Sequence, residues 1–157
     1  MRQQWSGAVV VALLTLVVGC GGDGTPRPPT GPDDSEAALT ARIDGVPFAS
    51  VFATVGHSAG QVFINAGVGD PLRAIGFQFP DQGPDQFMMA PGNPVSAGVT
   101  IGNAPWVAGG DMGGGSISVT TSTANRIAGT FEFTVVAQGG QQPAELTVTE
   151  GGFDITY

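Results

Sequence analysis

Lysine is absent from the 157-residue chain, and charged residues of all kinds make up only 11% of it. The formal net charge is −8, and the five cationic side chains are arginines scattered along the sequence, at Arg2, Arg27, Arg42, Arg73 and Arg126. Nucleic-acid binding needs a cationic surface against phosphate, so we expect no nucleic-acid partner. An acidic surface is not attracted to anionic lipid head groups either.

Cysteine and histidine are each present once, as Cys20 and His57. A single cysteine excludes an intrachain disulfide. A single histidine leaves too few nitrogen and sulfur ligands for a transition-metal site. We therefore expect neither a metal of this class nor another cofactor.

Long hydrophobic runs are rare, and the clearest one lies near the N-terminus. After Arg2 come eleven residues, Ala8–Val18, of which only Thr15 is polar. As a helix this run would span roughly 16 Å, about half the hydrocarbon core of a bilayer. Such a length is typical of an export signal and too short for a spanning helix. The sequence therefore predicts a helical signal peptide over residues 1–19.

The residues that close this run form a specific motif. Val17-Val18-Gly19-Cys20 resembles the lipobox of bacterial lipoproteins, although Val17 stands where the family usually has leucine. The resemblance implies cleavage before Cys20, diacylglycerol on its thiol and a fatty acyl group such as palmitate on the new amino terminus. Two or three acyl chains anchor a protein firmly where one does not. The alternative is a secreted protein with an unmodified cysteine.

Composition divides the remaining chain into two parts. Residues 20–37 are rich in glycine, proline and aspartate and have almost no apolar side chain, so they predict a disordered, semi-stiff tether. From residue 38 to residue 157, short runs alternate between apolar and polar residues, and no stretch shows helical spacing over ten residues. This pattern predicts an all-β domain, an antiparallel sandwich of about eight strands, with a partly open barrel as the alternative.

Individual strands and turns can be placed within this domain. Asp44-Gly45 predicts a tight turn between a strand that ends at Ile43 and a second apolar run, Phe48–Val55. Proline-rich residues 80–105 are expected to be irregular, with only brief or edge strands. Further runs with strand-like alternation are Gln61–Ala66, Leu72–Phe79, Ser116–Thr121, Arg126–Ala137, Glu145–Thr149 and Phe153–Tyr157. Gly151-Gly152 predicts a bulge or a tight bend that puts Phe153, Ile155 and Tyr157 on one face.

The two ends of this domain carry a family resemblance. Leu39–Ala49 (LTARIDGVPFA), Arg126–Phe133 and Val148–Ile155 resemble the opening and closing patterns of a family of uncharacterised bacterial lipoproteins with an all-β domain of unknown function. The resemblance spans roughly residues 38–157 and is weak through residues 80–115. It implies a β fold and surface anchoring, and it assigns no activity and no site residues.

Two motifs invite a catalytic interpretation. Gly56-His57-Ser58-Ala59-Gly60 matches the G-x-S-x-G nucleophile elbow, but that elbow opens a helix, whereas Gln61–Asn65 has the pattern of a strand. We therefore expect a hairpin turn here. Glu132 with Glu145 or Glu150 could form the carboxylate pair of a hydrolase. Each of these glutamates lies on the polar face of an alternating strand, which is typical of a solvated charge.

Two further sets of residues are candidates for binding. Asp81, Asp85 and Asp111 are weak candidates for calcium, which needs only oxygen ligands, although the spacing of a calcium loop is missing. The alternative is carboxylates solvated in turns. Trp106 and Phe87 could line a ligand groove, for instance by stacking on a glycan, or they could fill the open end of a sandwich.

Taken together, these features favour a non-catalytic, lipid-anchored domain of the cell envelope that acts as a binding or structural module. It would be held on the membrane through Cys20 and would contact an envelope protein or glycan. Gly21 and Gly22, with no aspartate directly after Cys20, favour the outer membrane, at its periplasmic or surface face. The alternatives are an envelope hydrolase that uses carboxylates and a calcium-stabilised adhesin-like module.

Overall fold

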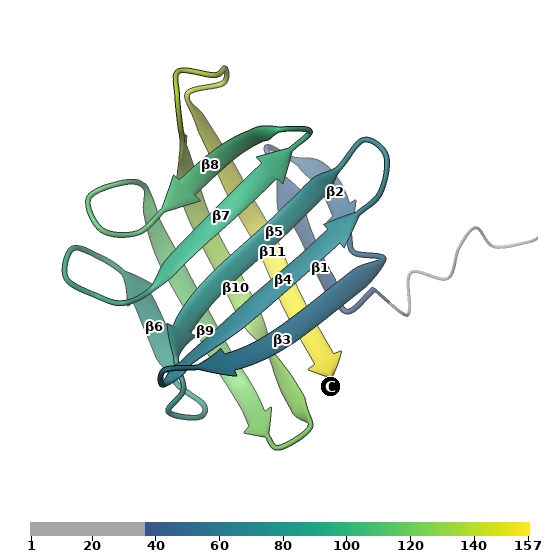
Figure 1. The fold of residues 1–157 in the computed structure, drawn as a ribbon, viewed down its shortest axis with the longest axis vertical. Coiled ribbons are helices and arrows are strands. Elements are labelled where there is room, and N and C mark those ends of the chain that lie inside the picture. Colours follow the sequence, from purple (N-terminus) through teal and green to yellow (C-terminus); the bar gives the residue numbers. More distant parts are fainter. Residues whose placement is uncertain (1–36) are drawn as a thin grey trace, which may run out of the picture. The chain divides into compact units, whose positions relative to one another are not determined.

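The structure, a computed structural model, describes residues 37–157. Over these residues the protein is an all-β domain (Figure 1). The predicted signal peptide, Cys20 and the tether before residue 37 lie outside these residues. Within them, no helix has the length and apolar character needed to cross a membrane. The strands are β1 (Leu39–Ile43), β2 (Val46–Ala49), β3 (Phe52–Ser58), β4 (Gln61–Val68), β5 (Arg73–Pro80), β6 (Gln86–Met89), β7 (Ser96–Ile101), β8 (Ala104–Ala108), β9 (Gly114–Thr123), β10 (Arg126–Ala137) and β11 (Glu145–Thr156).

These strands form one antiparallel sheet that folds over on itself into two layers (Figure 1). The front sheet has the order β3-β4-β5-β7-β8, and the back sheet contains β2-β1-β11-β10 followed by β9 and β6. The layers are joined at one corner, where Val136 and Ala137 at the end of β10 pair with Val107 and Trp106 of β8. This arrangement confirms the predicted all-β sandwich or partly open barrel, with eleven strands in the described residues instead of about eight.

The additional strands arise where the sequence was misread. The run Phe48–Val55 is not one strand, because the chain crosses from the back sheet to the front sheet at Ser50, between β2 and β3. Ser50 is buried, and its polar atoms are bonded to Leu39: its hydroxyl accepts from the Leu39 N–H at 3.0 Å, and its N–H donates to the Leu39 carbonyl at 2.9 Å. A buried polar residue therefore sits at the crossing without an unsatisfied group.

The proline-rich middle is more regular than predicted. It contains β6, β7 and the start of β8, and β7 lies inside the front sheet between β5 and β8, not at an edge. Pro91 and Pro94 fall in the loop before β7, so this strand keeps the N–H donors that an interior position requires.

The predicted turns are confirmed. Asp44 and Gly45 have φ angles of 48° and 76°, as the two central residues of a primed hairpin turn require. The Asp44 carboxylate also accepts the backbone N–H of Thr147 at 2.7 Å, which fixes the turn against β11. Ala59 and Gly60 form the same kind of turn between β3 and β4, so the G-x-S-x-G segment is a hairpin.

Aromatic side chains from both sheets meet in the core. Phe77 of the front sheet lies 5.0 Å from Phe131 and 5.5 Å from Phe153 of the back sheet, measured between ring centroids. Cross-strand pairing places Phe131 opposite Gly151 and Phe153 opposite Gly129. A side chain on either glycine would strike the opposing phenylalanine, so the glycines leave room for the rings.

The predicted irregularity in β11 is also confirmed. Glu150 has a φ angle of 51°, and the pairing of β11 with its neighbours shifts register beside it. The extra residue shifts the alternation along the strand, as a bulge does. Leu146 and Val148 are buried before the bulge, and Phe153 and Ile155 are buried after it. Phe153 therefore reaches the core.

The two adjacent glycines of β11 provide a matched test of this packing. A Cβ on Gly151 would overlap the Phe131 carbonyl oxygen and lie 2.6 Å from the Phe131 ring, whereas the nearest atom to a Cβ on Gly152, outside its chain neighbours, is 3.9 Å away. We expect Gly151→Ala to lower the free energy of unfolding by about 1–3 kcal/mol through overpacking. Gly152→Ala should change it by less than about 0.5 kcal/mol. Urea unfolding measures both, and equal effects would contradict the packing described here.

Candidate functional site

The outward-facing positions of the front sheet carry no charged residue. Side chains alternate along each strand, and the inward positions hold the two ionisable residues of these five strands, His57 and Arg73. The outward positions are Phe52, Thr54, Gly56 and Ser58 in β3, Gln61, Phe63, Asn65 and Gly67 in β4, Ala74, Gly76, Gln78 and Pro80 in β5, Ser96, Gly98 and Thr100 in β7, and Pro105 and Val107 in β8. We call this surface the front face.

Register brings small residues together on this face. Asn65 pairs with Gly76, and Gly76 pairs with Gly98, so two glycines lie side by side on β5 and β7. Glycine weakens the interior of a strand by roughly 0.5–1 kcal/mol relative to alanine and often marks a place where a ligand approaches the backbone. The front face therefore has a glycine floor near its centre.

Two side chains cover glycines of the neighbouring strand. A Cβ on Gly67 would overlap Phe52 Cζ, and a Cβ on Gly76 would be 2.6 Å from Asn65 Oδ1. The ring of Phe52 thus covers Gly67 and remains 50% exposed, while the amide of Asn65 covers Gly76. Both groups are held against the sheet with one side open to solvent.

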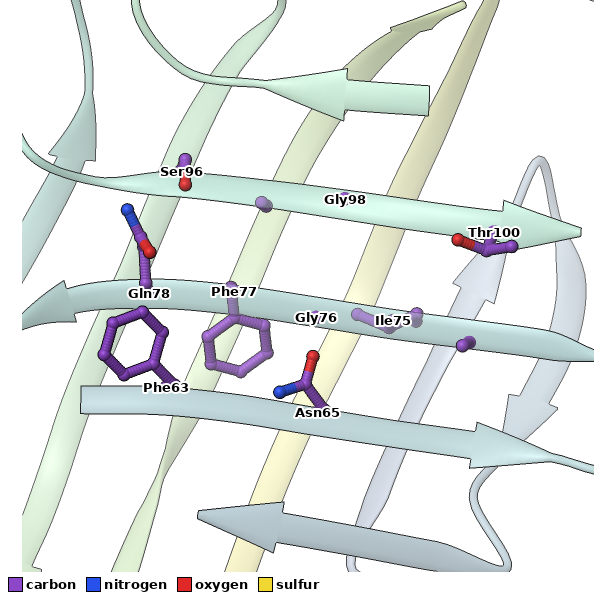
Figure 2. Close-up of a pocket in the computed structure, with 11 residues that line it drawn as sticks. Phe63, Asn65, Ile75, Gly76, Phe77, Gln78, Ser96, Gly98 and Thr100 are labelled. Atoms are coloured by element: carbon purple, nitrogen blue, oxygen red, sulfur yellow. The ribbon is translucent and has the colours of Figure 1, made fainter. Parts of the chain in front are cut away.

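A shallow groove of about 300 Å³ lies on the front face over β4, β5 and β7. Figure 2 shows Phe63 and Asn65 leaning from β4 toward β5, and Gln78 leaning from β5 toward Ser96 of β7. Strand spacing and rise give the floor a width of roughly 10 Å and a length of about 13 Å, from the level of Thr100 to that of Ser96. The groove is wide enough for an extended chain of small units.

The polar side chains of the groove are available to a ligand. Within residues 37–157, the side-chain hydrogen bonds do not involve the side chains of Asn65, Gln78, Ser96 or Thr100, and none of these holds a buried polar atom without a partner. Gln61 lies two residues before Phe63 on β4. Its side-chain oxygen Oε1 is buried and has no hydrogen-bond partner within the described residues. The face thus offers amide donors and acceptors together with hydroxyl groups.

The outer surface of the back sheet differs, because it holds charged pairs. Arg126 donates to both carboxylate oxygens of Asp154 at 2.8 and 2.6 Å, and Arg42 donates to Glu150 at 2.9 Å. Glu132 is also exposed on this side. Charge is therefore segregated, with ion pairs on the back sheet and none on the front face.

Trp106 and Phe87 do not form the predicted groove. Each is only 4% exposed and belongs to the core. Phe87 stacks on Phe79 with ring centroids 5.0 Å apart, and the indole N–H of Trp106 donates to the Pro143 carbonyl at 2.8 Å. A tryptophan can be buried in this way because its polar group has a partner. The sequence placed an aromatic site in the proline-rich middle, whereas Phe52 on β3 and Tyr157 after β11 are exposed and Phe63 on β4 is partly exposed.

The three aspartates considered for calcium do not converge. Asp81 contacts His57, and Asp85 accepts hydrogen bonds from the Gln82 side chain and from its neighbour Gln86. Asp111 lies in the separate loop between β8 and β9. In the part of the chain that the structure describes, no three acidic, histidine or cysteine residues are placed to hold a metal ion together.

His57 bonds to residues that the sequence did not connect with it. Its Nδ1 lies 2.9 Å from Asp81 Oδ2, and its Nε2 lies 3.1 Å from the Tyr157 hydroxyl, which donates to the Thr123 carbonyl at 3.2 Å. Ser58 takes no part, since adjacent residues of a strand point to opposite faces. The three side chains are more than one-third exposed and tie the edge of the front sheet to the end of β11.

The three glutamates of the hydrolase hypothesis are only partly brought together. Glu132 and Glu150 line one hollow of about 410 Å³ on the back sheet, and Glu145 is not among its residues. Glu150 is exposed and paired with Arg42, and Glu132 is exposed as well. The acid of a carboxylate pair is usually distinguished by a buried, apolar environment, which neither glutamate has.

A signal for the front face was present in the sequence but was not used. No Asp, Glu, Lys or Arg occurs from residue 45 to residue 69, from 74 to 80 or from 86 to 110, and these segments supply the strands of the front sheet. Solvent-facing strand positions normally include charges. Their absence over several successive strands therefore indicated an uncharged surface.

Comparison with known proteins finds no matching family model, no matching curated protein and no matching solved structure. The resemblance to uncharacterised lipoproteins at the two ends of the domain stays a prediction. Function is therefore inferred from the geometry and chemistry of the site.

The ion pair on the back sheet gives a prediction about acid behaviour. Hydrogen bonding to Arg126 is the main cause that lowers the pKa of the Asp154 carboxyl; loss of hydration opposes it, and the positive charge adds to it. Because the folded pKa is below the unfolded value of about 3.9, the contribution of Asp154 to stability is present above that pH and is lost as pH falls through the folded pKa.

When the Asp154 carboxyl is followed by carbon NMR, we expect it to titrate below the usual aspartate pKa of about 3.9. Arg126→Gln should raise the pH midpoint of the Asp154 titration. Arg42→Gln, which removes the other arginine of this surface, should leave it in place. An Asp154 midpoint that does not respond to Arg126→Gln would contradict the assigned cause.

Proposed function

We propose that this chain is a lipid-anchored domain of the cell envelope that binds its ligand without catalysis, through the front face. The observation that carries the proposal is the uncharged groove over β4, β5 and β7, with its glycine floor and its unengaged amide and hydroxyl groups. Stability does not explain the glycines, since glycine inside a strand reduces it.

A catalytic role has less support. The front face has no acid, base or charged group to move a proton, and Ser96 and Thr100 have no adjacent histidine. The His57 cluster offers a hydrogen-bonded acid, imidazole and hydroxyl, but all three side chains are more than one-third exposed, so water is not excluded from them. Binding alone requires only a shaped surface with suitable polar groups.

Anchoring follows from the lipobox resemblance and not from the geometry of the domain. Lipid on Cys20 would attach the chain to a membrane, with the outer membrane favoured, and the residues up to 37 would let the front face meet a partner beyond the bilayer. The proposed partners are envelope molecules, either glycan or protein. A chain with formal net charge −8 would not be drawn to an anionic bilayer surface by itself, so its attachment depends on the lipid.

The anchor can be tested by substituting its cysteine. We expect Cys20→Ser to abolish incorporation of a labelled palmitate analogue and to leave the signal peptide uncleaved, because the thiol is the site of lipid transfer. Thr15→Ser, a conservative change inside the apolar run, should leave labelling intact. Labelling is read after gel separation of cells that express each variant. Normal labelling of the Cys20→Ser protein would contradict the assignment.

The binding face can be tested without knowing the ligand. A photoreactive amino acid is placed at Thr100 or Ser96 on the front face, and at Thr130 or Thr149 on the outer surface of the back sheet. After irradiation of intact cells, we expect crosslinked species of higher mass from the front positions only. Equal yields from both faces, or none from the front, would remove the support for this binding site.

A further inference from the structure

We propose that the ligand of the front face is a neutral glycan chain, bound through its hydroxyl groups and its apolar ring faces. This inference rests on the proposed function, because it names the class of ligand for the same surface. It goes further by assigning roles to Phe63, Asn65, Gln78 and Phe52.

Charge complementarity limits the ligand to an uncharged molecule. A bound phosphate, sulfate or carboxylate needs a cationic side chain or convergent N–H donors, and a bound cation needs a carboxylate. The outward positions of β3, β4, β5, β7 and β8 supply neither Arg, Lys, Asp nor Glu. Backbone N–H groups of the interior strands are engaged in the sheet and cannot turn toward a ligand.

The polar groups present suit hydroxyl groups. Each hydroxyl of a sugar donates and accepts, and the side-chain amides of Asn65 and Gln78 do both as well, from opposite ends of one planar group. Ser96 and Thr100 add two hydroxyls along β7, so polar groups lie on both sides of Gly76 and Gly98. Gly98, over which no side chain lies, leaves the sheet open beside the Asn65 amide that covers Gly76 (Figure 2).

The aromatic rings suit the apolar faces of sugars. The negative face of a phenyl ring attracts the weakly positive C–H groups that a sugar ring presents on one side. Phe63 lies in the groove, and Phe52 lies over Gly67 with half of its surface exposed. Register puts these two residues four positions apart along neighbouring strands, about 14 Å between Cα atoms. This separation is too large for one sugar ring, so the two aromatic rings would contact non-adjacent units of an extended chain.

A protein partner fits the same face less well. Extended peptides add to the edge of a sheet, where unpaired backbone groups accept them, and not to its face. Folded partners usually bury a centre rich in aromatic residues, methionine and arginine. The centre of the front face is Asn65, Gly76 and Gly98, which offers little apolar area to such a partner.

The test uses the full chain with its lipid, purified in a detergent that has no sugar head group. Its mobility is measured in native gels that contain a mixed-linkage β-glucan, a galactomannan or dextran, and in gels that contain the acidic polysaccharide alginate. We expect retardation in at least one neutral gel and none in alginate, relative to a gel without polysaccharide. Retardation in alginate equal to that in the neutral gels, or no retardation in any neutral gel, would overturn the assigned ligand class.

Variants assign the binding to the front face. Asn65→Asp keeps the shape of the side chain but removes its N–H donors and adds a charge, and Phe63→Leu removes a ring. Each should weaken the apparent affinity by about tenfold, the usual scale for an unmade hydrogen bond or a lost platform. Asn125→Asp in the turn between β9 and β10 adds the same charge away from the face and keeps the acceptor used by Thr123, so it should bind as the parent does.

Unchanged melting temperatures establish that each variant is folded before binding is compared. If the front-face variants bind as tightly as Asn125→Asp, the assignment of the glycan to this face is wrong. The crosslinking experiment separates the two proposals. Front-face crosslinks to protein without any glycan retardation would leave the binding module standing and reject the neutral glycan, whereas the absence of both would reject both.

Discussion

The contact on which both layers depend is the meeting of Phe77 from the front sheet with Phe131 and Phe153 from the back sheet. These rings fill the space between the sheets, and they reach one another because Gly151 and Gly129, opposite Phe131 and Phe153, carry no side chain. Sheets packed face to face need interdigitating side chains of this size to exclude water. The bulge at Glu150 completes the arrangement, since it returns Phe153 to the inner face after the register shift.

The same cross-strand pairing, glycine opposite a larger residue, occurs on the outer surface with a different result. Phe52 lies over its partner Gly67, and Asn65 lies over its partner Gly76. On the inner face the arrangement lets rings from two sheets interlock. On the outer face a ring and an amide cover the opposing glycines and stay exposed to solvent. One packing device therefore serves the core on one side and the candidate site on the other.

Sequence reasoning recovered those features that depend on neighbours in the chain. The turn at Asp44-Gly45, the alternation in β5 and β10 and the bulge in β11 are local signals, and each was confirmed. It failed where distant segments decide the outcome. Trp106 is buried because Pro143 supplies its hydrogen-bond acceptor, and nothing in the local pattern of residues 104–108 indicates this partner. The split at Ser50 likewise depends on Leu39.

The candidate site was hidden from sequence reasoning for the same reason. Asn65, Gly76 and Gly98 come from three strands, and only the register between the strands makes them neighbours. Read singly, each is an unremarkable polar or small residue at a solvent-facing position. A charge-free surface on a chain with net charge −8 nevertheless requires that acidic residues be confined elsewhere, and those within residues 37–157 lie in loops and on the back sheet. That confinement keeps acidic charge off the front face, as a surface for an uncharged ligand requires, since a nearby carboxylate would hold water that the ligand has to displace.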